Sequence, residues 1–240
     1  MTSSPFEAEF DNRPQALPIF IASDRSLSME GEPIRTLNDM LELFRIGFIN
    51  HPAVGDIARL ALVSFSDTAT LDVPLADIVE LKAMPILTAD GNTAYGVAFD
   101  LLASVIPSAV RALGAKGYKV LRPTIFLLTD GCPNDNAESR RDAYRRLVDP
   151  ENRWTPNIAV FGLGTADQQV CRNVAHGRGK AFFPLNGMDV AESLKRIIPE
   201  IIVSVIRSVD AAAAGEPVPD LIPKKIEGMA SFEPLDEVEA

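Results

Sequence analysis

The sequence lacks several features on which whole classes of protein depend. Its 2 cysteines, Cys132 and Cys171, give no disulfide framework, which favours a reducing compartment. No stretch approaches the roughly 18 consecutive apolar residues of a membrane span. The opening stretch MTSSPFEAEF is acidic and has no continuous apolar core. We therefore expect no signal peptide, no membrane partner and a cytoplasmic location.

An excess of positive charge is also missing. The chain has 33 Asp and Glu residues against 23 Lys and Arg residues, so its formal net charge is −10. Nucleic-acid binding needs a basic face that neutralises phosphates, so we expect no nucleic-acid partner. A basic protein, a cation or a small cationic ligand fits this charge better. With 47% hydrophobic and 23% charged residues, the composition is that of a globular chain.

Short apolar runs alternate with amphipathic helical patterns along most of the chain. Strands are predicted for runs that are short, branched or aromatic, and bounded by Gly, Pro or Asp: 17–22, 57–65, 124–129, 157–164 and 180–185. Apolar steps of three and four predict helices over 34–48, 97–105 and 197–209. Segment 67–75 follows the second strand so closely that we expect a hairpin. The pattern predicts a Rossmann-like α/β fold, with a mostly parallel central sheet, one antiparallel edge strand and helices on both faces.

Helix starts and chain ends can also be predicted. Three starts have the form of a capping box, with acceptors at Asp135, Thr165 and Asp189, and Pro199 predicts a bend or break in the last helix. Residues 1–14 read as a flexible N-terminal extension and 15–210 as the domain. Residues 211–240 have seven acidic residues against two lysines, four prolines and no periodic apolar face, which predicts a flexible acidic tail.

Polar clusters fall where ligands gather in an open parallel sheet, at the carboxyl ends of strands. DRSLS (24–28) follows the first strand, DGNTAYG (90–96) precedes the second long helix, and TDGCPND (129–135) ends the strand at 124–129. We expect one site that collects Asp24, Ser26, Ser28, Thr93 and Asp130. Two carboxylates and three hydroxyls are hard oxygen donors, which suit Mg²⁺ or Mn²⁺ and suit zinc poorly. Neutral hydroxyls leave such a metal able to accept one more anionic oxygen from outside.

In this order, DRSLS, GNT and LLTDGCPND resemble the metal-ion-dependent adhesion site of von Willebrand factor A (vWA) domains. The resemblance covers about residues 15–210, and every position of the family pattern is filled. It implies a non-catalytic module that captures an Asp or Glu of a protein partner through the metal. In the family, the two serines and the threonine bind the metal directly or nearly so, while the two aspartates often act through water. The matching positions are Ser26, Ser28 and Thr93, and Asp24 and Asp130.

Within that family, MEGEPI (29–34), GNTAYG and TDGCPND are most similar to the compact bacterial type associated with tellurite resistance, the TerY group. Those proteins are usually associated with a protein kinase and a protein phosphatase. The resemblance therefore implies a bacterial stress or signalling role with partners of that kind. Arg25 and Leu27 depart from the family, in which small residues are usual. Neither is a ligand position, but they place a cation and an apolar group beside the metal.

Two other interpretations remain open at this point. DRSLS alone also suits a helix cap, because Ser and Asp cluster at turns for ordinary hydrogen-bonding reasons. A Mg²⁺-dependent phosphotransfer enzyme of haloacid-dehalogenase or receiver-like type also places aspartates after parallel strands. Such phosphatases usually have a second Asp two places after the nucleophile, where Ser26 stands here, and no Lys suits a receiver domain. Cys132 has no histidine at a spacing that implicates it as a base. We therefore expect a binding module and not an enzyme.

Overall fold

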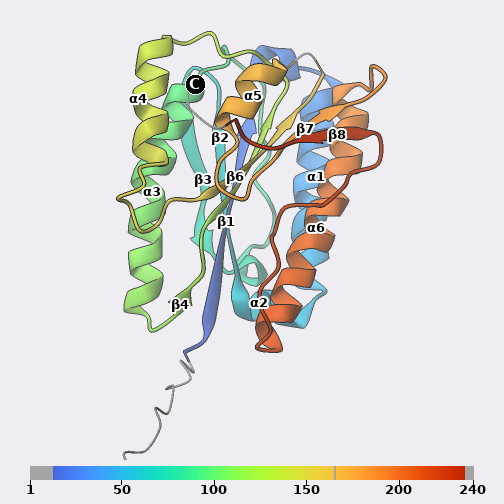
Figure 1. Ribbon diagram of the computed structural model, residues 1–240. Coiled ribbons are helices and arrows are strands. Elements are labelled where there is room, and N and C mark those ends of the chain that lie inside the picture. Colours follow the sequence, from blue (N-terminus) through green and yellow to red (C-terminus); the bar gives the residue numbers. More distant parts are fainter. Residues whose placement is uncertain (1–12, 165, 236–240) are drawn as a thin grey trace, which may run out of the picture.

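A computed structural model describes residues 13–164 and 166–235 (Figure 1). Within these residues, eight strands form one sheet in the order β3-β2-β1-β5-β6-β7-β8, with the short β4 paired to β1 beside this path. The strands are β1 Gln15–Asp24, β2 Ala58–Phe65, β3 Ala69–Ala76, β4 Lys119–Val120, β5 Thr124–Thr129, β6 Asn157–Gly162, β7 Ala181–Pro184 and β8 Met229–Phe232. The helices are α1 Glu32–Ile49, α2 Pro52–Ile57, α3 Tyr95–Ala115, α4 Ala137–Leu147, α5 Gln168–Val174 and α6 Val190–Ala213, with 3-10 turns at Leu27–Met29 and Ile78–Glu80.

The sheet is mostly parallel, as predicted. β1 pairs in parallel with β2 and β5, β5 with β6, and β6 with β7, whereas β3 runs antiparallel to β2 at one edge. The predicted α/β class and antiparallel edge strand are confirmed. A second antiparallel strand, β8, pairs with β7 at the other edge and was not predicted.

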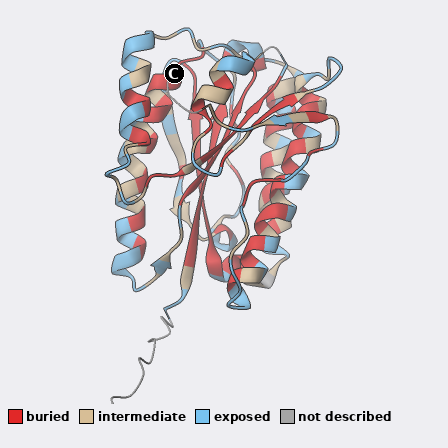
Figure 2. Ribbon diagram, viewed as in Figure 1, coloured by how far each residue is buried: buried red, intermediate tan, exposed pale blue. Residues whose placement is uncertain are grey.

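The sheet lies between two apolar layers (Figure 2). Ile19 and Ile21 of β1 pack in the layer with α1, α2 and α6, whereas Phe20 and Ala22 pack in the layer with α3, α4 and α5. Successive side chains of a strand point to opposite faces, so both sets are buried. This is why β1 reads as a continuous apolar run without alternation.

Helix α3 contains the helix predicted over 97–105 and is longer, extending from Tyr95 to Ala115. By length and composition alone, its 21 residues could cross a membrane. A helix in a protein core passes the same test, and here Tyr95, Phe99, Leu102 and Ile106 are buried in one of the two apolar layers. In this fold, one face of α3 therefore packs into the core of the protein.

Residues 211–235 do not form the loose extension that their composition predicted. Helix α6 continues to Ala213, and β8 then adds to the sheet. Between them, apolar side chains of the tail are buried in the layer with α1 and α6: Leu221, Ile222 and Ile226. The prediction was wrong because prolines and acidic residues separate these apolar positions, so they pack as an irregular segment without a periodic face. Residues 1–12 and 236–240 lie outside the described residues, and the domain limits stay a prediction.

The predicted helix signals were partly right. Asp189 caps α6 as expected, accepting a hydrogen bond of 2.8 Å from an amide in the first turn. Asn136 caps α4 instead of Asp135, because the Asp135 carboxylate accepts a backbone amide at the start of α3 at 2.6 Å. Thr165 lies outside the described residues. Pro199 lies inside α6 and does not end it.

Candidate metal centre

The loops after β1 and β5 meet at the carboxyl edge of the sheet. β1 ends at Asp24 and β5 at Thr129, and the two strands are parallel neighbours. The loop before α3 joins them, because the Leu27 amide donates to the Gly91 carbonyl at 3.0 Å. Three chain segments that lie far apart in the sequence therefore form one site.

A hydrogen-bonded chain connects three of the predicted site residues. Ser26 Oγ and Ser28 Oγ lie 3.0 Å apart, and Ser28 Oγ donates to Asp130 Oδ1 at 2.8 Å. Ser26 and Asp130 are buried, whereas Ser28 is exposed. The exposed Ser28 hydroxyl therefore links two buried groups, the Ser26 hydroxyl and the Asp130 carboxylate.

Asp24 is the most deeply buried member of the set, with 0% exposure. Its Oδ1 accepts a hydrogen bond from the Ser26 amide at 2.9 Å, and its Oδ2 accepts one from Thr129 Oγ1 at 2.7 Å. The local turn of DRS and the end of β5 therefore fix this carboxylate from two sides. Burial raises the pKa of Asp24, and these hydrogen bonds offset part of that effect.

Thr93 reaches the same place from the loop before α3. A Cβ added to Gly131 would lie 2.7 Å from Thr93 Oγ1, so the hydroxyl of Thr93 packs against the residue that follows Asp130. The Asn134 amide also donates to the Thr93 carbonyl at 2.9 Å. The absence of a side chain at Gly131 leaves room for the Thr93 hydroxyl.

Two residues of the site were missed at the sequence level. The Tyr95 hydroxyl lies 3.0 Å from Thr129 Oγ1 and 3.1 Å from the Gly131 carbonyl, and Thr129 in turn holds Asp24. Tyr95 and Thr129 are both fully buried, so they support the site without facing solvent. The sequence offered one signal for each residue: Thr129 directly precedes Asp130, and Tyr95 lies two residues after Thr93.

Arg25 does not stand as a free cation beside the site. Its guanidinium contacts Asp90 Oδ1 at 2.5 Å, and Asp90 also accepts a hydrogen bond from Ser66 Oγ at 2.8 Å. This ion pair ties the loop after β1 to the loop before α3. Leu27, in contrast, is 59% exposed and presents an apolar surface at the rim.

The electrostatics of the site favour a bound cation. Burial raises the pKa of Asp130 to about 6, and the nearby negative charge of Asp24 adds to that increase. A cation held near Asp24 and Asp130 would favour the ionised form of both carboxyl groups. No cluster of three or more His, Cys, Asp or Glu side chains suited to a metal occurs in residues 13–164 and 166–235. A donor set of two carboxylates and three hydroxyls fits a hard cation such as Mg²⁺ and fits zinc poorly.

Sequence comparisons find no counterpart, since no family model and no curated protein matches the chain. Solved structures do match. The pilus adhesin SpaC from Lactobacillus rhamnosus GG, in its open conformation, has a TM-score of 0.62 at 11% identity, over 80% of this chain and 30% of the adhesin chain. A von Willebrand factor type A protein from Catenulispora acidiphila has a TM-score of 0.59 at 15% identity, over 80% of this chain and 43% of its own.

A mutant of the PilB minor pilin from Streptococcus sanguinis has a TM-score of 0.57 at 11% identity, over 89% of this chain and 65% of the pilin. The chain thus spans less than two thirds of the length of each of these three structures. At such low identity, the likeness concerns the arrangement of strands and helices. The chain has the fold of von Willebrand factor A domains.

Proposed function

We propose that this protein is a non-catalytic, Mg²⁺-dependent binding module. Asp24, Ser26, Ser28, Thr93 and Asp130 would hold Mg²⁺ or Mn²⁺, and the bound ion would accept an Asp or Glu carboxylate of a protein partner. The observation that carries the proposal is the continuous chain from Ser26 through Ser28 to Asp130, above a carboxylate that is fully buried at Asp24.

The protein groups have distinct parts in this proposal. Asp24 and Asp130 supply negative charge, while the three hydroxyls supply neutral oxygens and leave part of the ion's charge uncompensated. Ser28 is exposed, so the open side of the site faces a partner. Leu27 offers that partner an apolar contact at the rim.

The phosphotransfer alternative has less support. A nucleophilic Asp must present an oxygen to the phosphorus of its substrate. Asp24 is inaccessible to solvent, and each of its carboxylate oxygens accepts a hydrogen bond within the protein. The fold likeness to a pilus adhesin adds an analogy in favour of binding, since fold alone does not establish function.

The biological setting is part of the same proposal. The motifs MEGEPI, GNTAYG and TDGCPND support a bacterial stress or signalling role of the TerY kind, with a protein kinase or phosphatase as the partner. The acidic composition and the two unpaired cysteines support a cytoplasmic location without a membrane or nucleic-acid partner.

Titration with Mg²⁺ and Mn²⁺ in a calorimeter tests the metal site. We expect one site in the wild type, and its loss in Asp130→Ala and Ser28→Ala. The matched control is Asp142→Ala, which removes an exposed carboxylate on α4. Equal binding by all four proteins would contradict the proposal.

Retention of proteins from a bacterial lysate tests the partner. Immobilised wild type should retain proteins in Mg²⁺ and release them in EDTA, and Asp130→Ala should not. Hydrolysis of p-nitrophenyl phosphate by the wild type, abolished in Asp24→Asn, would instead support the enzyme.

A further inference from the structure

Helix α6 leaves one long face uncovered. Val203 is 59% exposed, and the residues that flank it on the same face are also exposed or half-buried: Lys195, Pro199, Glu200, Ile206, Arg207 and Asp210. We call these seven residues the α6 face. At about 100° per residue, Val203 lies on its centre line. A large apolar side chain therefore stands at the middle of a charged helix surface.

The charges of the α6 face are poorly compensated within the molecule. Among the described residues, Lys195 and Glu200 form no ion pair. Arg207 donates a hydrogen bond to Ser204 Oγ at 3.2 Å, and Asp210 lies 3.5 Å from His51 Nε2. Lys195, Glu200 and Arg207 thus have no ion-pair partner among the described residues, and Asp210 contacts His51.

We propose that the α6 face binds the α6 face of a second copy of this chain, with the two helices antiparallel and Val203 at the two-fold axis. Glu200 lies three residues before Val203 and Arg207 four residues after it. In an antiparallel pair, Glu200 of one copy therefore falls opposite Arg207 of the other, with an offset of about 1.5 Å along the axis. Lys195 lies eight residues before Val203 and Asp210 seven residues after it. Lys195 of one copy therefore falls opposite Asp210 of the other in the same way.

The two flanks of the helix agree with this pairing. A two-fold axis perpendicular to both helices keeps each residue on its own flank, and Glu200 and Arg207 lie on the same one. Pro199 and Ile206 share the opposite flank and are also nearly equidistant from Val203. Each copy therefore matches an anion with a cation and an apolar residue with an apolar residue. A surface that complements itself about one point is what an isologous dimer requires.

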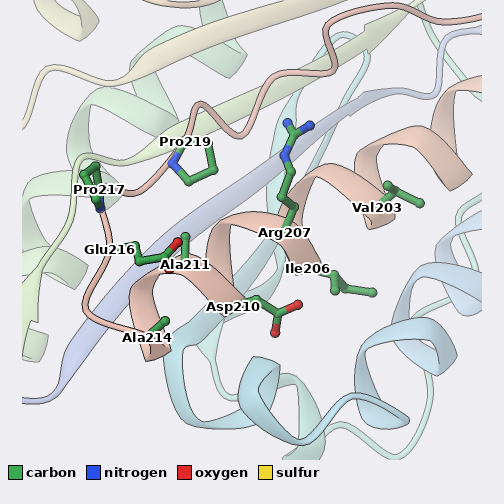
Figure 3. Close-up of a pocket in the computed structure, with 9 residues that line it drawn as sticks. All are labelled: Val203, Ile206, Arg207, Asp210, Ala211, Ala214, Glu216, Pro217 and Pro219. Carbon is green, nitrogen blue, oxygen red and sulfur yellow. The ribbon is translucent and has the colours of Figure 1, made fainter.

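A groove beside the C-terminal half of α6 provides room for the second copy. It has a volume of about 680 Å³ and lies between the helix and the segment that follows it (Figure 3). Arg207 and Glu216 line it, together with Pro217 and Pro219. In the antiparallel pair, Glu200 of the second copy enters this groove and meets Arg207.

Helix α1 widens the apolar part of the surface. Gly47 packs against Ile202 of α6, and a Cβ at Gly47 would lie 3.2 Å from the Ile202 side chain, so the two helices lie close together. Leu43 and Ile46 on α1 are 41% and 42% exposed. With 24 residues, α6 is about 36 Å long, and a strip two packed helices wide gives about 700 Å² per copy, close to the roughly 800 Å² of a stable interface.

The pairing directs the two candidate metal centres to opposite ends of the dimer. α6 begins near the carboxyl edge of the sheet, where Asp24 and Asp130 lie, and ends at the opposite edge (Figure 1). Antiparallel helices therefore place one centre at each end. The dimer does not depend on the proposed function. If both hold, the assembly joins two partners.

Sedimentation equilibrium of the full chain tests the proposal. The protein is measured at concentrations up to about 0.2 mM, well above a micromolar Kd. We expect a monomer–dimer equilibrium within this range. Val203→Glu places two carboxylates at the two-fold axis and should raise Kd at least about 100-fold. Glu200→Arg should raise Kd about tenfold, because it faces Arg207 of the other copy. The double variant Glu200→Arg with Arg207→Glu should restore the wild-type Kd.

Ile86→Glu is the matched control, because Ile86 is 83% exposed and lies on the loop before α3, outside the α6 face. It should leave Kd unchanged, and circular dichroism should show all variants folded. A wild type that stays monomeric throughout the concentration range overturns the proposal. A dimer that survives Val203→Glu, or that Ile86→Glu dissociates, overturns it as well. A double variant that stays as weak as Glu200→Arg overturns the antiparallel register.

Discussion

Asp130→Asn should stabilise the protein when no divalent metal is present. The substitution keeps the size of the side chain and an oxygen that can accept the hydrogen bond from Ser28. It removes a negative charge that is buried and lies near the charge of Asp24. The Asp130 carboxylate, which we propose as a metal ligand, should therefore lower the free energy of unfolding when no divalent metal is bound.

The magnitude follows from the pKa of Asp130. Burial raises this pKa from 3.8 to about 6, and each pKa unit corresponds to about 1.4 kcal/mol, so ionisation costs up to about 3 kcal/mol. Because Asp130 keeps 5% of its surface exposed to water, the cost of ionisation falls to about 1 to 2 kcal/mol. For a chain of this length, that range corresponds to an increase in Tm of about 2 to 8 °C.

The sign also fixes the pH dependence. The folded protein holds the Asp130 proton to a higher pH than the unfolded chain does, so the wild type loses stability as pH rises from about 4 to above 6. The Asn variant has no such proton to lose. Its advantage over the wild type should be absent near pH 4 and complete near pH 7.5.

Saturating Mg²⁺ should reverse the order of the two proteins. A ligand that binds only the folded state stabilises it by about 2.7 kcal/mol at a concentration of 100 times Kd. The wild type should gain this amount and the Asn variant much less.

Thermal and urea unfolding at both pH values, in EDTA and in Mg²⁺, measure the difference. Asp142→Asn, on the exposed face of α4, is the control and should shift neither curve. If the Asn variant is less stable than the wild type in EDTA near pH 7.5, the Asp130 charge is not unfavourable in the folded protein. If Mg²⁺ stabilises both equally, Asp130 does not contribute to binding.

Three further substitutions or deletions give separate tests. Tyr95→Phe removes the hydroxyl that contacts Thr129 and should cost about 1 kcal/mol of stability; calorimetry should also show weaker Mg²⁺ binding, and unchanged binding would limit Tyr95 to packing. Gly131→Ala places a Cβ within 2.7 Å of Thr93 Oγ1, so it should weaken Mg²⁺ binding, and unchanged affinity would exclude Thr93 from the donor set. Deletion of residues 217–240 exposes apolar surface of the core. At about 25 cal/mol per Å² of exposed apolar surface, it should lower the free energy of unfolding by several kcal/mol. A urea midpoint equal to that of the full chain would show that the segment does not stabilise the domain.

The strands and helices could be predicted because each is encoded by its own neighbours in the sequence. A strand such as β5, TIFLLT, is apolar throughout because helices cover both faces of the sheet. The order of DRSLS, GNT and TDG along alternating strands and helices also placed the five candidate site residues at one edge. That they hold a metal remains a prediction, although the structure brings four of them into one hydrogen-bonded arrangement and Thr93 beside it.

The supporting contacts of the site depend on pairs of residues that are distant in the sequence. Thr129 lies 105 positions from the Asp24 carboxylate that it holds, and Arg25 lies 65 positions from Asp90, its ion-pair partner. No local pattern selects such partners, because the register of β1 against β5 and the path of the loop before α3 decide which side chains meet. The same reason explains why the Asp135 carboxylate accepts the Gly96 amide of α3, 39 positions away.

The sequence by itself determined the alternation of strands and helices and the composition of the candidate site, since both follow from local periodicity and from the types of residue at strand ends. Only the tertiary structure decided that the C-terminal segment is ordered and packs against the core. The four residues of β8, MASF, have little strand signal within an acidic stretch, and they become a strand because the free edge of β7 offers unpaired backbone groups. Burial of Ile226 and its neighbours against the core then offsets the entropy lost on ordering a segment that contains several prolines.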